Sequence, residues 1–316
     1  MGDCNREKNF VSAVIYIHNC EKRIEIFLQT IMEVLEENFE HSEIICVNDS
    51  SNDRSPELIK SVSQSAKTTG ISIVNLSYFH GLEAAMHAGT DLAIGDFVLE
   101  FDHTLLDYDK AEIMRVYRKS LEGYDMVSAV PDRKERLSSR LFYLVFRRFA
   151  AVSGPMCTES FRILSRRVIN RILSMNKTVP YRKAIYAGAG LRADTIRYMV
   201  TGQGEKIPAD PKEKRYRIGL AVDAFIFFTE LGYRAAIVMT MLMLFLSVSM
   251  VVYVAVIYAA AHPVAGWTTT LLFLSTAFAG LFGILTVIVK YLQLLVNLVF
   301  KRKQYSFESI EKLTKE

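Results

Sequence analysis

Short apolar runs alternate with helical patterns through the first 130 residues. The apolar, β-rich run Val11–Ile17 is followed at Glu21–Leu35 by apolar residues at helical spacing. The succession recurs and predicts further strands at 43–47, 71–76, 97–101 and 126–130, with helices at 55–65, 82–93 and 108–121. Strands that alternate with helices in this way predict βαβ units, and therefore an α/β domain with a mostly parallel sheet.

A parallel sheet binds its ligands at the carboxyl ends of its strands. Four loops follow the predicted strands and are the places to look for chemistry: 18–21, 48–54, 78–82 and 102–109. Farther along, 203–214 carries two prolines and mixed charge, which predicts a loop. The pattern of 215–234 predicts an amphipathic helix lying at a membrane interface.

Two long apolar runs lie near the C-terminus. Neither Ala235–Ala261 nor Val264–Val289 contains a charged residue, and His262-Pro263 separates them. Each run can cross a hydrocarbon core of about 30 Å, and neither has a polar face to turn toward water. They predict a transmembrane hairpin over 235–289, with spans at 235–261 and 266–289.

Basic residues flank the outer ends of this hairpin: Arg215, Arg217, Arg234, Lys290, Lys301, Arg302 and Lys303. Positive charge near the membrane favours the cytoplasm, so both termini are expected there. The polar start MGDCNREKNF has no signal-peptide core, which agrees with a cytoplasmic domain over 1–214. Residues 290–316 are then a cytoplasmic tail.

Charge and cysteine usage narrow the classes of partner. The net charge of +4 is modest. The sequence has no basic stripe with interleaved aromatic residues, so nucleic-acid binding is not expected. Four cysteines without CxxC spacing predict free thiols rather than bridges or metal ligands.

Two of the loops carry candidate chemistry. VNDSSNDRS at 47–55 offers carboxylates that can accept hydrogen bonds from a base or ribose, although Asp and Ser are also ordinary turn residues. Asp102 follows the fourth predicted strand and offers a hard oxygen ligand for a divalent cation, or is a solvated loop acid.

Five stretches occur in order between residues 14 and 169: VIYIHNCEKRI, VNDSSNDRS, FHGLEAAMHAGTDLAIGDFVLEFD, SSRLFYLVFRRFAAVSG and ESFRILSRRVI. They resemble the polyisoprenyl-phosphate glycosyltransferases of glycosyltransferase family 2, such as bactoprenol glucosyltransferases and dolichol-phosphate mannosyltransferases. The resemblance implies a GT-A-type fold. It also implies transfer of a sugar from a nucleotide sugar, UDP-sugars being favoured, to a polyprenyl phosphate, with Mg²⁺ or Mn²⁺ and inversion.

The resemblance also implies a place for this chemistry, at the cytoplasmic face of a bacterial inner membrane, where the product serves glycan or cell-envelope assembly. Asn19 and Asp49 match nucleotide-contacting positions, and Asp102 matches the first acid of the family's Asp-x-Asp metal motif. Arg162 matches an arginine of the catalytic region, where Glu159 is a second candidate. Four further nucleotide-binding candidates are Glu21, Ser51, Asp53 and Gly81.

The acceptor phosphate has five candidate ligands: Arg133, Arg140, Lys214, Arg215 and Tyr216. An equally good interpretation of the basic ones is contact with solvent or lipid headgroups.

Two departures from the family pattern weaken the expected metal site. Thr104 stands where the motif has its second acid, and Ser160 replaces an acid before Phe-Arg. Metal binding then depends on Asp102 together with Asp107 or Glu159. The alternative function is a catalytically weakened paralogue that acts as a binding or scaffolding subunit. Small residues at 277, 280 and 283 permit close helix packing and, with it, a homo-oligomer.

Overall fold

The computed structural model describes residues 6–133, 158–174, 181–188, 190–201, 211–228 and 306–314, with scattered positions between 238 and 295. The chain divides into two compact units. The first unit joins residues 1–221 to residues 303–316, and the second covers 222–302.

A single eight-stranded sheet organises the first unit, in the order β7-β5-β6-β4-β1-β2-β3-β8. Its strands are β1 Val11–Ile17, β2 Ser42–Asn48, β3 Gly70–Leu76, β4 Phe97–Phe101, β5 Met126–Pro131, β6 Phe161–Ser165, β7 Ala193–Tyr198 and β8 Phe307–Lys312. Strands β3, β2, β1 and β4 are parallel neighbours, whereas β6 and β8 run antiparallel to the strands beside them. The predicted mostly parallel α/β fold is confirmed.

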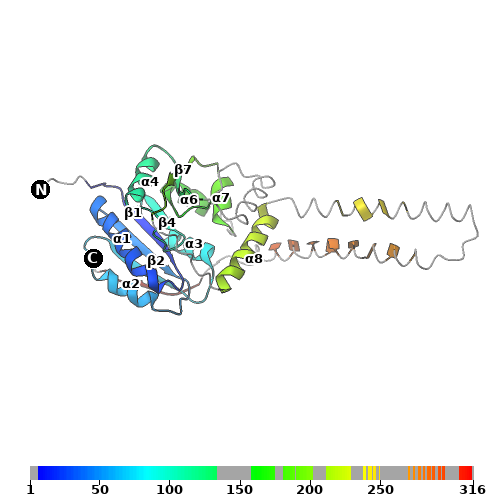
Figure 1. The fold of residues 1–316 in the computed structure, drawn as a ribbon, viewed down its shortest axis with the longest axis horizontal. Helices are drawn as coiled ribbons and strands as arrows, with labels where there is room; N and C mark the ends of the chain where they lie inside the picture. Colours follow the sequence, from blue (N-terminus) through cyan, green and yellow to red (C-terminus); the bar gives the residue numbers. More distant parts are fainter. Residues whose placement is uncertain are drawn as a thin grey trace, which may run out of the picture. The chain divides into compact units, whose positions relative to one another are not determined.

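Helices cover both faces of this sheet (Figure 1). They are α1 Glu21–Asn38, α2 Ser55–Ser63, α3 Leu82–Leu92, α4 Ala111–Leu121, α6 Arg166–Ser174 and α7 Arg182–Gly188. A further helix, α8 Pro211–Phe228, does not belong to these layers. Alternate residues of β1 point to opposite faces, so Ala13 and Ile15 pack with α1, α2 and α4, while Val14 and Tyr16 pack with α3, α6 and α7. Both faces of β1 are buried, which explains why its sequence is apolar apart from Ser12.

The expected strands and helices up to Pro131 are present, with ends displaced by a few residues. One larger difference is α8, because 211–214, expected to be loop, are its first turn. Pro211 fits there, since the first helical position needs no backbone N–H donor. Of the segment 215–234, a helix is observed as far as Phe228, and its side chains beyond Val222 lie outside the described residues. The membrane-interface role expected for it stays a prediction.

The C-terminal segment differs most from expectation. Residues 290–316 were expected to be a tail, but Phe307–Lys312 forms β8 and pairs with β3. A strand of six residues at a sheet edge forms its hydrogen bonds with that edge. The sequence of such a short, charge-rich segment does not by itself predict this pairing.

The predicted spans 235–261 and 266–289 lie largely outside the described residues. Within the described part of the chain, no helix combines the length and apolar character needed to cross a membrane. Scattered positions of the second unit are helical, and a Cβ atom at Gly280 would collide with Met243. The small residue at 280 therefore permits close packing inside this unit, as expected; the homo-oligomer stays a prediction.

Candidate functional site

The loops after β1 and β2 are joined by reciprocal hydrogen bonds. The backbone N–H of Asn19 donates to Ser51 Oγ at 3.2 Å, and the N–H of Asn52 donates to Asn19 Oδ1 at 2.9 Å. The N–H of Glu21 donates to Asp53 Oδ2 at 2.9 Å. The structure thus brings four of the six nucleotide-binding candidates together at the carboxyl edge of the sheet.

Asp49 ties these loops to the loop after β3. Its buried carboxylate accepts hydrogen bonds from the backbone N–H groups of His80 at 2.7 Å and Gly81 at 2.8 Å, and from the Tyr16 hydroxyl at 3.1 Å. Burial raises the pKa of Asp49, although these hydrogen bonds oppose the change. Asp49 and Gly81 therefore join the other four candidates, with Asp49 already engaged in holding the loop.

The first turns of α8 pack on the same loop. Gly81 adopts φ +87°, in the left-handed region, and a Cβ atom there would run into the ring of Tyr216. Phe79 meets the Tyr216 ring edge-on, with centroids 5.9 Å apart. Tyr216, expected near the acceptor phosphate, therefore lies beside the nucleotide-binding candidates.

A buried cluster of charges lies where β4 ends. Asp102 Oδ2 is 2.7 Å from Arg162 Nη2, and Asp102 Oδ1 is 2.8 Å from Arg182 Nη2. Glu159 Oε1 lies 3.4 Å from Arg162 Nη2 and 3.3 Å from Lys183 Nζ. The three catalytic candidates Asp102, Glu159 and Arg162 are therefore in contact, and Arg182 and Lys183 complete the group.

Arg182 extends this cluster toward the nucleotide-binding loops. Its Nε lies 2.9 Å from Glu83 Oε2, and its Nη1 lies 2.9 Å from Glu100 Oε2. The Tyr186 hydroxyl donates to the other oxygen of Glu100 at 3.0 Å. Glu83 belongs to the first turn of α3, directly after Gly81, so the charged cluster and the loop edge are continuous.

The basic side chains decide the charge state of Asp102. Burial alone raises the pKa of this carboxyl group, but Arg162, Arg182 and Lys183 more than offset it and hold the pKa well below its usual range. The pKa of Glu159 is also lowered, because Arg162 and Lys183 outweigh its burial. Both carboxylates are ionised at neutral pH.

The described residues around Asp102 do not form a site for the expected divalent cation, and its binding stays a prediction. Both oxygens of Asp102 contact guanidinium groups, which would repel a metal ion placed beside them. Asp107 is engaged elsewhere, accepting from the Tyr198 hydroxyl at 2.7 Å and lying 3.5 Å from Arg133 Nη1. Among the described residues no three His, Cys, Asp or Glu side chains are arranged to hold a metal.

The remaining acceptor candidates are not gathered by the described contacts. Arg133 pairs with Asp107 and is half exposed, while Arg215 is an exposed residue of α8. Arg140 and the side chain of Lys214 lie outside the described residues. Their binding of an acceptor phosphate stays a prediction.

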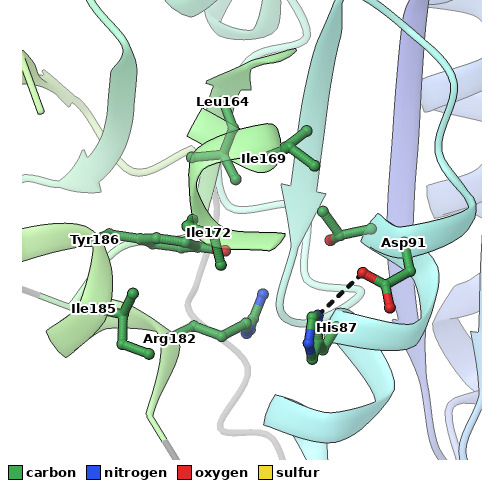
Figure 2. Close-up of a pocket in the computed structure, with 9 residues that line it drawn as sticks. His87, Asp91, Leu164, Ile169, Ile172, Arg182, Ile185 and Tyr186 are labelled. Carbon is green, nitrogen blue, oxygen red and sulfur yellow. Dashed lines mark ion pairs between the residues drawn. The ribbon is translucent and has the colours of Figure 1, made fainter. Parts of the chain in front are cut away.

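Figure 2 shows a small cavity on the α3 side of Arg182. It measures about 20 Å³, and its wall is mostly apolar: Leu164, Ile169, Ile172, Ile185 and Tyr186. His87 and Asp91 form an ion pair of 3.4 Å at its edge. This space suits about one water molecule, so it is too small for a sugar or nucleotide.

Comparison with known families agrees with this arrangement. The model of glycosyl transferase family 2 matches residues 12–173, slightly more than half of the 316 residues. The chain belongs to glycosyl transferase family 2. The match runs from β1 to α6 and so includes the loop edge, Asp102, Glu159 and Arg162.

Relatives in glycosyl transferase family 2 differ in sequence identity to this chain and in the length that aligns with it. An uncharacterized glycosyltransferase of Synechocystis is 33% identical over 188 residues, 58% of each chain. A prophage bactoprenol glucosyl transferase homolog of Escherichia coli K12 is 28% identical over 236 residues, 71% of this chain and 74% of the relative. The match spans less than two thirds of the first relative's length.

A solved structure supports the fold alone. Glucosyl-3-phosphoglycerate synthase from Mycobacterium tuberculosis, in complex with phosphoglyceric acid, superposes with a TM-score of 0.50 at 13% identity. The superposition covers 68% of this chain and 80% of that enzyme. It agrees with the GT-A-like fold expected from the sequence.

The acidic and basic residues that surround Asp102 are not among the candidates predicted from the sequence, apart from Glu159 and Arg162. Glu100 could have been noticed, because a carboxylate inside the apolar strand FVLEF needs a buried partner. Glu83 looks like an ordinary acid in a first helical turn. Arg182 and Lys183 lie 80 residues or more after Asp102, and no local pattern marks them.

Proposed function

We propose that the protein transfers a sugar from a nucleoside diphosphate sugar, with UDP-sugars favoured, to a polyprenyl phosphate at a membrane surface. The observation that carries this proposal is the continuity of the loop edge with the charged cluster, through Gly81, Glu83, Arg182 and Asp102. A donor whose base and ribose occupy the loops would have its diphosphate and sugar directed toward that cluster.

Relatives support the choice of acceptor. One relative, from E. coli, is a bactoprenol glucosyl transferase homolog, and a 27% identical relative from Pectobacterium atrosepticum is an undecaprenyl-phosphate 4-deoxy-4-formamido-L-arabinose transferase. Both names describe transfer to a lipid carrier. The same class of acceptor is therefore proposed for this chain.

The reaction forms one bond and breaks one. A phosphate oxygen of the acceptor attacks the anomeric carbon, and the bond from that carbon to the donor's diphosphate breaks, releasing the nucleoside diphosphate. The acceptor is already anionic at neutral pH, so no strong general base is needed. The buried basic side chains hold Asp102 and Glu159 ionised and in place. Inversion is proposed from family membership.

The pairing of β8 with β3 supports a two-span anchor. Residues 306–314 share one sheet with residues before 201, so both segments must lie on the same side of any membrane. Crossings between them must then come in pairs. The apolar runs 235–261 and 266–289 supply one such pair in the proposed hairpin, with both ends in the bacterial cytoplasm.

The test is transfer of radiolabelled sugar from UDP- and GDP-sugars to undecaprenyl phosphate by the purified chain in detergent, with Mg²⁺, Mn²⁺ or EDTA. Asp102→Asn is the matched variant, because it removes the charge and keeps the shape between the two arginines. A lipid-linked product that falls at least tenfold in the variant supports the enzyme. Failure of every donor would contradict it.

One observation favours the alternative of a weakened paralogue. Ser160, in place of an acid, is tied to the Tyr198 hydroxyl at 2.5 Å inside the protein. Ser160 thus belongs to a buried hydrogen-bond network. A binding subunit would tolerate a serine at this position. Nucleotide binding without turnover would favour this alternative.

A further inference from the structure

Ser306, the residue directly before β8, contacts the loop between β3 and α3, which belongs to the proposed donor site. The backbone N–H of Ser306 donates to His80 Nε2 at 3.1 Å, across 226 residues of sequence. In return, the N–H of Ser77 donates to the Ser306 carbonyl at 3.0 Å. Ser306 therefore contacts the segment between β3 and α3 at two points, Ser77 and His80.

His80 passes this contact on to Asp49. Its Nδ1 lies 2.5 Å from the Tyr78 carbonyl, which can only accept, so Nδ1 carries the proton and Nε2 is free to accept from Ser306. The His80 ring stacks on Tyr78 with centroids 3.9 Å apart. Its backbone N–H donates to Asp49 Oδ1 at 2.7 Å. One residue thus links β8 to the carboxylate that ties the loops together.

A second path runs through two asparagines. Asn75 Nδ2 donates to Ser309 Oγ of β8 at 2.9 Å, and Asn75 Oδ1 accepts from Asn48 Nδ2 at 2.9 Å. Asn48 Oδ1 accepts from the N–H of Ser51 at 3.1 Å. Because each amide donates on one side and accepts on the other, an unbroken series of hydrogen bonds joins Ser309 to the loop after β2.

We propose that β8, together with Ser306 directly before it, is a positioning element of the donor site, so that affinity for the nucleoside diphosphate depends on Ser306 and Ser309. This inference rests on the proposed function. Loops that are ordered before the nucleotide arrives lose less conformational freedom on binding. The segment that follows the proposed membrane hairpin thus contributes to donor binding in the catalytic domain.

The first test separates the two polar groups of Ser306. Ser306→Pro removes its N–H and keeps its carbonyl, and proline is tolerated where a strand begins. Ser306→Ala is the matched control, since it removes only the hydroxyl group. The Kd for UDP and GDP is measured by isothermal titration calorimetry of the full-length chain in detergent. In Ser306→Pro this Kd should rise about three- to tenfold, the loss expected for one hydrogen bond. In Ser306→Ala it should change little.

The second test uses the asparagine path. Ser309→Ala should raise the KM for the donor by about two- to fivefold, as one neutral hydrogen bond is lost, and leave kcat and the KM for the lipid unchanged. Glu308→Gln, on the exposed side of the same strand, is the control. A wild-type Kd in Ser306→Pro and a wild-type donor KM in Ser309→Ala, with sugar transfer intact, would overturn the positioning role and leave the proposed function standing. A wild-type chain that binds neither nucleotide would overturn both.

Discussion

The carboxylate of Asp102 lies between two guanidinium groups, and these neighbours determine its chemistry. A metal ion would have to displace two buried ion pairs before it could bind. Sequence comparison can identify the acid of a metal motif, but it does not reveal which charges surround that acid in space. Here those charges come from β6 and α7, and they make Asp102 the anchor of two arginines.

Removing Arg182 should destabilise the protein strongly. In Arg182→Met, Glu83, Glu100 and Asp102 stay buried and lose a shared partner, which costs about 3–5 kcal/mol for a broken buried pair. Urea denaturation in detergent measures the loss. Arg115→Met is the control, because Arg115 is exposed in its pair with Glu112 and its removal should change stability little. Equal losses in the two variants would contradict the buried network.

The stabilisation by Asp102 should depend on pH. Because its pKa is lowered in the folded state, its contribution is present above the unfolded pKa of about 3.9 and is lost as the pH falls below that value. Asp102→Asn should be less stable than the wild type at pH 7, and the difference should shrink below about pH 4. Asp49, whose pKa is raised, acts in the opposite direction but equally in both proteins. Denaturation midpoints between pH 7 and 3 test this; a constant difference would contradict it.

At the scale of elements, the contact between α8 and the loop before α3 should control donor binding. Gly81→Ala combines a positive φ with a collision against Tyr216, whereas Gly190→Ala introduces only the strain of φ +64° with open space around it. That strain costs about 1–2 kcal/mol. We expect a larger loss of stability in Gly81→Ala and, in addition, weaker UDP binding. Thermal melting and titration measure both; equal effects would show that Tyr216 does not matter.

The elements up to Pro131 could be predicted because each is amphipathic or apolar over its own length. The loop edge followed from them, since parallel strands place their carboxyl ends together. Strands β6 and β8 could not be predicted in this way, because each depends on a neighbour far away in sequence. The same limit applies to Arg182, which reaches Asp102 only when α7 packs beside β4.

For the whole molecule, the pairing of β8 with β3 makes a prediction about membrane topology. Single cysteines replacing Glu57 in α2 and Glu308 in β8 should react with a membrane-impermeant maleimide from the same side, because their strands and helices belong to one unit. His262→Cys, between the proposed spans, should react from the opposite side. The chain used would lack its native cysteines, of which Cys20 and Cys46 are buried.

Intact cells and inverted vesicles distinguish the outcomes. If the proposed hairpin exists, the cysteine at position 262 is labelled in cells and the other two only in inverted vesicles. If all three cysteines are labelled from one side, the apolar runs do not cross the membrane. That result would still agree with the pairing of β8 with β3. Labelling of positions 57 and 308 from opposite sides would be incompatible with β8, because no strand can pair across a bilayer with an edge that remains on the other side.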